Sequence, residues 1–277
     1  MLDILFDAVI DTLKLLPFLF FTFLILELLE HKINERTKEK LINSNKFGPV
    51  IGSILGVIPQ CGFSSMAAEF YMTRVISLGT LFAVFLSTSD EMLPLFISYN
   101  VSLNLIIRTL LLKFLIGLIV GIIIDLVYNK KGAYHIKDLC EIEKCDCEKG
   151  IIHSSLIHTL HVFVFVLIIN LILNFVLENY GIKFLEKLLL KGNFFSVFLT
   201  SLIGLIPNCS ASILLTELYL KDIITYGSLI SGLLVNSGIG ILILFKYNKN
   251  IKENLNITFL LYIIGIIFGI IIDVIGV

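Results

Sequence analysis

Long apolar runs, separated by short polar stretches, follow one another along almost the whole chain. The longest cover residues 13–29, 162–177 and 256–277. About 20 such residues cross the roughly 30 Å hydrocarbon core of a bilayer as a helix. The first run is too long, and too acidic at its far end, for a cleaved signal peptide. The pattern therefore predicts an all-α membrane protein that crosses the bilayer several times.

Helix-breaking and polar residues recur at a constant spacing of 148 residues. The segment GVIPQCGFSS at 56–65 returns as GLIPNCSASI at 204–213, and GLIVGIIID at 117–125 returns as GIIFGIIID at 265–273. Apolar residues match by chance in such a chain, whereas Pro, Cys, Tyr and Asp at one spacing do not. The chain therefore contains an internal duplication.

The duplication predicts a transmembrane repeat at 1–128, a hydrophilic linker at 129–150 and a second transmembrane repeat at 151–277. Each repeat is expected to contain a long first helix, a basic loop, the proline-containing stretch, a further helix and a closing helix. The expected first helices are 7–30 and 155–178, the further helices start near Val75 and Ile223, and the closing helices are 104–127 and 255–275.

The proline-containing stretches, 48–73 and 196–220, allow two topologies. If each is one spanning helix broken at its proline, the repeats are parallel. If each is a re-entrant hairpin of two half-length helices, the repeats are inverted. Basic loops do not decide, because the parallel arrangement places 31–46, 181–193 and 246–254 inside, whereas the inverted one leaves 181–193 outside. We favour inverted repeats, since helix breakers are dense here and broken helices that meet at the midplane are a recurrent transporter plan.

Composition limits the choice of partners. Apolar residues make up 57% of the chain and charged residues 16%, with a formal net charge of −1. This composition indicates a lipid bilayer, in the plasma (inner) membrane, as the environment and gives no indication of nucleic acid as a partner. The GxxxG spacing in 117–121 and 265–269 allows close helix contact within the chain or in a homodimer.

A second pair of breaks lies beyond the prolines, LSTSDEMLP at 86–94 and LVNSGIGIL at 234–242. Non-helical backbone at membrane depth survives only inside protein or beside water, so all four breaks are expected to meet in a polar cavity. The candidate substrate-binding residues are Gln60, Cys61, Ser64, Ser87, Thr88, Ser89, Asp90, Glu91, Asn208, Cys209, Ser212, Asn236 and Ser237. Ser64, Ser65 and Ser212 have an alternative role as N-caps of the second hairpin helices.

Asp90 and Glu91 stand out because carboxylates inside a membrane are costly and usually functional. The second repeat has Gly238 and Ile239 at the corresponding positions. The pair therefore favours a cationic substrate, a coupling proton, or both. If the helix before them ends at Leu86, the two acids would instead be interfacial.

Other polar residues have a structural alternative beside the chemical one. The matched pairs Glu69 with Glu217 and Asp125 with Asp273 lie near expected helix ends, which favours solvated caps. Cys61 and Cys209 are soft-metal ligands or small fillers of tight tips. In the linker, Cys140, Cys145 and Cys147 with His135 either bind a metal or belong to a flexible segment.

The PQCG tip, the STSDEMLP stretch and the PNCS tip resemble a family of ten-helix heavy-metal exporters, whose members are described variously as arsenic efflux proteins or manganese transporters. The resemblance covers essentially the whole chain and implies a secondary transporter for a metal or metalloid ion, with no bound cofactor. The second half lacks the glycine after the tip cysteine and the acidic pair, which argues against a symmetric site.

Chemistry leaves the cargo open. Manganese prefers oxygen ligands such as those of Asp90 and Glu91, whereas an arsenical prefers the thiolates of Cys61 and Cys209. No GxxxxGKS motif is present, so coupling to protons or another ion is expected, with Asp90 or Glu91 as the carrier. An ion channel is the other transport alternative. No histidine lies near the tips, so an enzyme is not expected.

Overall fold

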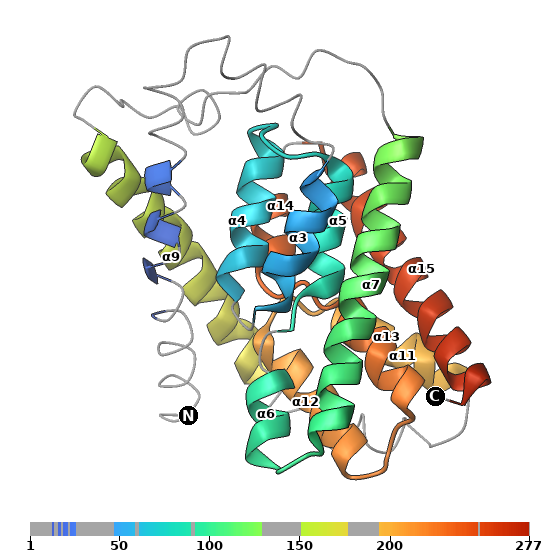
Figure 1. The fold of residues 1–277 in the computed structure, drawn as a ribbon. Coiled ribbons are helices and arrows are strands. Elements are labelled where there is room, and N and C mark those ends of the chain that lie inside the picture. The colour runs from blue at the N-terminus through green and yellow to red at the C-terminus, as the bar shows by residue number, and fades with distance from the viewer. Residues whose placement is uncertain are drawn as a thin grey trace.

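The structure is a computed structural model that describes residues 13, 16–17, 19–21, 23–25, 47–58, 61–89, 92–128, 151–176, 194–248 and 250–276. Every regular element in these ranges is a helix, as predicted (Figure 1). In the first half these are α3 (Gly48–Val57), α4 (Cys61–Met72), α5 (Leu78–Ser87), α6 (Met92–Ser98) and α7 (Leu103–Val127). In the second half they are α9 (Ile151–Val176), α11 (Phe194–Gly204), α12 (Cys209–Leu220), α13 (Tyr226–Val235), α14 (Gly240–Tyr247) and α15 (Ile251–Ile275).

Helices of equal length occupy corresponding positions in the two halves. α4 and α12 have 12 residues each, α5 and α13 have 10, and α7 and α15 have 25. α5 and α13 begin three residues later than expected. The reason is local: Arg74 and Asp222 have positive φ angles of 63° and 60°, and Ser77 and Thr225 then cap the next helices.

Four segments are long and apolar enough to cross a membrane: 78–98 (α5 with α6), α7, 226–247 (α13 with α14) and α15. In an 18-residue apolar stretch of each segment, 75% and 89% of the residues are buried in the two interrupted segments. The corresponding shares are 33% in α7 and 28% in α15. The interrupted helices therefore form the centre, and α7 and α15 face outward. Ile107, Leu111 and Leu115 on α7 are about half exposed, as suits contact with lipid. The chain is a multi-pass membrane protein, in keeping with the expected plasma-membrane location.

Each half contributes a short helix to the core of the other half. α4 packs against α14, and α12 packs against α6. One apolar core joins α4, α5 and α7 to α14 and α15, and the other joins α11, α12 and α13 to α6. The closing helices also run in opposite directions, because α7 ends at the top of Figure 1 while α15 ends at the bottom, beside the C-terminus.

Polar contacts also connect the halves. The Tyr71 hydroxyl donates to Glu253 Oε1 at 2.5 Å, and the Arg74 guanidinium reaches the same oxygen at 3.4 Å. On the opposite face of the interface, the hydroxyls of Thr109 on α7 and Tyr226 on α13 share a hydrogen bond of 2.9 Å.

The GxxxG glycines make contacts inside one chain. A Cβ atom on Gly79 would lie 2.1 Å from the carbonyl oxygen of Gly121, and a Cβ on Gly227 would lie 2.3 Å from that of Gly269. α7 therefore approaches α5, and α15 approaches α13, more closely than any larger residue would permit. A homodimer is not needed to explain the motif.

Asp125 and Asp273 hold the beginnings of the interrupted helices. Asp125 accepts from the Ser77 hydroxyl at 2.7 Å and from the Gly79 amide at 2.8 Å. Asp273 accepts from Thr225 at 2.8 Å and from the Gly227 amide at 2.9 Å. The expectation of a capping role fits these contacts, although each aspartate caps a neighbouring helix and not its own.

Asp125→Ala and Asp273→Ala should each lower the free energy of unfolding by about 1–2 kcal/mol, because two hydrogen bonds at a helix start are lost. The Asn variants, which keep an acceptor oxygen, should be milder. Thermal unfolding in detergent micelles measures this effect. Transport per folded protein should stay near wild type. A stable but inactive Asp125→Ala protein would instead place this carboxylate in the mechanism.

Candidate functional site

The residues after α5 and after α13 form a polar region inside the two central spans. Thr88 and Ser89 follow α5 and are 3% and 1% exposed, while Asn236 and Ser237 follow α13 and are 3% and 1% exposed. α5 ends at Ser87, but the break is buried and does not lie at the protein surface. The burial of Thr88 and Ser89 favours a break inside the protein over a helix that ends at an interface. Asp90 and Glu91 themselves lie outside the described residues.

Hydroxyl groups donate hydrogen bonds to several carbonyls near the end of α5. Ser87 donates to the Ala83 carbonyl at 2.6 Å, and Thr88 donates to that of Val84 at 2.7 Å. Ser89 donates to the Ser87 carbonyl at 3.1 Å. A broken helix in a bilayer must find such partners, because no water replaces the lost bonds. These side chains therefore stabilise the break as well as lining it.

The break after α13 is supported differently. The backbone N–H of Asn236 donates to the Gly232 carbonyl at 3.0 Å. The side-chain oxygen of Asn236 accepts from the backbone N–H of Gly238 at 2.9 Å. The Ser237 hydroxyl is buried and has no hydrogen-bond partner within the described ranges. A buried hydroxyl without a hydrogen-bond partner costs about 1–3 kcal/mol. The Ser237 hydroxyl is therefore a position where a ligand oxygen or an ion would supply the missing interaction.

Lys113 connects the two breaks, and sequence reasoning did not select it. It lies on α7 and is 1% exposed. Its amino group donates to the carbonyl oxygen of Thr88 and, at 2.8 Å, to that of Leu233 in the last turn of α13. The signal was present in the sequence as a single lysine inside the apolar run LLLKFLIGLI (110–119).

The residues at the starts of α4 and α12 do not cap these helices in the way that the sequence predicted. Asn208 is the N-cap of α12, and its side chain accepts from the Ser210 amide at 3.2 Å. Ser212 and Ser65 are not N-caps, because α12 and α4 already begin at Cys209 and Cys61. Their hydroxyls donate back to the Cys209 and Gly62 carbonyls at 2.8 Å. Gln60, which corresponds to Asn208, lies outside the described residues, and only the backbone of Cys61 is described.

The structure brings a tip of one half to a break of the other half. A Cβ atom on Gly240, at the start of α14, would lie 2.8 Å from the Ser64 carbonyl oxygen and 2.7 Å from the Phe85 ring. Ser64 itself is 0% exposed, and Cys209 is 6% exposed at the other tip. The predicted convergence of Ser64 with the break at 236–239 therefore fits these contacts.

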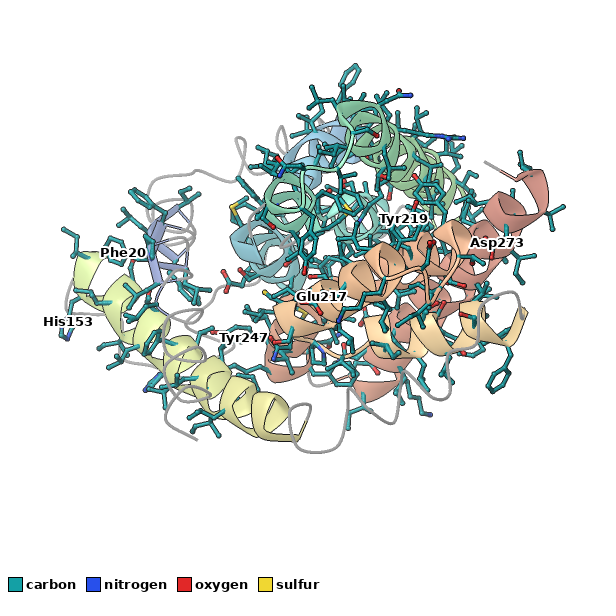
Figure 2. All side chains as sticks on the ribbon, turned by 90° about the horizontal axis from the view of Figure 1, so that it is seen from below. Phe20, His153, Glu217, Tyr219, Tyr247 and Asp273 are labelled. Atoms are coloured by element: carbon teal, nitrogen blue, oxygen red, sulfur yellow. The ribbon has the colours of Figure 1, made fainter. Side chains whose placement is uncertain are left out.

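The matched glutamates have different environments. Glu217 is half-buried and pairs with Lys221 at 3.2 Å, as a solvated residue would. Glu69 is 1% exposed, so the expectation of a solvated cap is wrong for this residue. Figure 2 shows Glu217 and Asp273 well apart, and His153 at the outer edge on α9, so these three groups do not form one cluster.

No group of three His, Cys, Asp or Glu side chains suited to a metal occurs within the described residues. Asp90, Glu91, Cys140, Cys145 and Cys147 lie outside those ranges. An open groove of about 550 Å³ runs along the outer face of α7, lined by Asn104, Arg108 and aliphatic side chains. It belongs to the lipid-facing surface and does not reach the breaks.

Interrupted helices whose polar breaks are buried at the centre of a multi-pass bundle are typical of membrane transport proteins. The chain belongs to the family described as "Putative, 10TM heavy-metal exporter" (ArsP_2), whose model matches residues 1–184. This match confirms the family resemblance of the sequence motifs and favours a transporter over an enzyme. No curated protein and no solved structure matches the chain.

Proposed function

We propose that the chain is a secondary, ion-coupled exporter of a divalent metal cation, manganese or a heavy metal, that binds between the two repeats. The observation that carries this proposal is the pair of buried polar breaks at the centre of the bundle, Thr88–Ser89 and Asn236–Ser237, each at most 3% exposed. Burial of so many polar groups inside apolar spans is costly, so it needs a functional reason.

The electrostatics of the breaks favour a cation. α5 and α13 direct their C-terminal ends to this region, and a helix C-terminus carries about half a negative charge. The carbonyls of Thr88 and Leu233 already accept from a lysine amino group. In sequence, Asp90 and Glu91 come directly after Ser89 and supply two carboxylates. Carboxylate, carbonyl, hydroxyl and amide oxygens suit Mn²⁺ and other hard divalent ions.

We further propose that the repeats are inverted and that α3–α4 and α11–α12 are re-entrant hairpins. The opposite directions of α7 and α15 in Figure 1 support this. So does the reciprocal packing of α4 on α14 and of α12 on α6. α3 and α4, at 10 and 12 residues, are each too short to span a bilayer alone.

An arsenical is the alternative substrate. Cys209 is buried, with 6% of its surface exposed, and it occupies the first position of α12, at the tip of the proposed second hairpin. Cys61 occupies the corresponding sequence position at the start of α4. Two thiolates could hold a trivalent arsenical without the acidic pair.

Proteoliposomes loaded with Mn²⁺, Cd²⁺ or arsenite test the cargo and the coupling. Flux of a divalent ion driven by a proton gradient should fall at least about tenfold in the Asp90→Asn, Glu91→Gln double variant, because two ligand and carrier carboxylates are lost. Glu217→Gln, which alters an exposed pair, is the matched control. Full gradient-driven flux in the acid variant would refute the coupling role. Arsenite flux that disappears in Cys61→Ser, Cys209→Ser would favour the alternative.

A single cysteine at Lys187, in a background without native cysteines, tests the topology. Inverted repeats predict that a membrane-impermeant maleimide labels this position from outside the cell. Lys252→Cys, at the start of α15, is expected inside in either topology and serves as the control. Labelling of both positions only after the membrane is opened would support parallel repeats.

A further inference from the structure

Lys113 is a buried basic residue that the proposed metal site does not use. It lies near the middle of α7, is 1% exposed, and is surrounded by apolar sequence. A lysine at this depth is expensive unless it has a specific partner. Its amino group donates to two backbone carbonyls, of Thr88 in the first half and of Leu233 in the second. The lysine therefore bridges the repeats.

The acceptors belong to corresponding helix ends. Thr88 follows α5 directly, and Leu233 lies in the last turn of α13. Because the two helices correspond in the duplicated sequence, two negative helix ends converge on one amino group. The position that corresponds to Lys113 in the second half is Leu261, which is 0% exposed. One lysine thus donates to both helix ends, and the second half has no lysine at the matched position.

We propose that Lys113 is a tethered cation that the transported metal ion displaces from the ends of α5 and α13. This inference rests on the proposed function. The ammonium group and the metal ion use the same carbonyls, so they occupy the position alternately. Whenever no metal ion is bound there, Lys113 neutralises the two helix ends. When a metal ion binds, the flexible lysine side chain moves aside.

This alternation separates two transport modes. Net export requires the transporter to change its orientation once without metal. In that step Lys113 compensates the partial negative charge of the two helix ends. Exchange of metal for metal uses only the loaded transporter, in which Lys113 is already displaced. A lysine with a purely structural role would affect both modes alike. A lysine that attracts an anionic substrate would, on removal, weaken substrate binding.

Lys113→Met tests these alternatives with Mn²⁺ as the probe. Two measurements are made on proteoliposomes: ⁵⁴Mn²⁺ exchange with Mn²⁺ on both sides, and net flux into a Mn²⁺-free compartment. Net flux should fall at least about tenfold while exchange stays within about threefold of wild type. Mn²⁺ binding to the purified protein should tighten about tenfold or more, because the competing ammonium is gone.

Companion variants keep the test decisive if Lys113→Met folds poorly. Lys113→Gln keeps a donor without the charge and should behave like Lys113→Met. Lys113→Arg keeps the charge and should retain much more net flux. Thr109→Val removes a hydrogen bond between the same two helices without changing charge. It should leave the ratio of net flux to exchange unchanged.

The outcomes distinguish a failure of the proposed role of Lys113 from a failure of the proposed function. Equal loss of exchange and net flux, equal behaviour of the Gln and Arg variants, or weaker Mn²⁺ binding in Lys113→Met would overturn the role of Lys113 and leave the exporter proposal standing. If the wild-type protein moves no divalent metal in either mode, the proposed function fails, and the role of Lys113 fails with it.

Discussion

Backbone hydrogen bonding in a bilayer is the constraint on which the structure depends. A helix that stops inside the membrane exposes carbonyls that no water can reach, and each must find a donor in the protein. At the end of α5 the donors are the hydroxyls of Ser87, Thr88 and Ser89, and at both breaks Lys113 adds its amino group. The polar residues that make the breaks tolerable are thus also the residues that we propose bind the transported ion.

The duplicated halves depend on each other for a core. Because α14 packs on α4 and α6 packs on α12, each half covers short helices of the other half as well as its own. The interface between the repeats therefore passes through the breaks, where a rigid-body movement of one half against the other would change the surroundings of a bound ion. The glycine contacts of α7 with α5 and of α15 with α13 keep each half together during such a movement.

The sequence predicted the all-helical class, the interruptions after α5 and α13 and a capping role for Asp125 and Asp273, because helix breakers and carboxylates are conspicuous in an apolar chain. The lone lysine in the apolar run 110–119 marks Lys113 as unusual, but the role of Lys113 was not predicted, since α7 is apolar on all sides and nothing in its pattern shows which face meets the breaks. The caps at Ser65 and Ser212 were placed one turn too late, as the helices begin at the tip cysteines. Glu69 and Glu217 match in sequence but not in burial, although α4 packs on α14 as α12 packs on α6, so the repeat pattern alone does not predict how exposed a matched residue is.

The central claim is that a metal ion binds where the two central helices are interrupted. Diffraction data collected at the manganese absorption edge, from crystals grown with Mn²⁺, would locate the ion directly. The account predicts an anomalous peak between segments 88–91 and 236–239, within reach of the Ser237 hydroxyl, with the Lys113 amino group moved away from it. A peak confined to the linker cysteines or to the outer surface, with Lys113 still bound to the Thr88 and Leu233 carbonyls, would contradict the account.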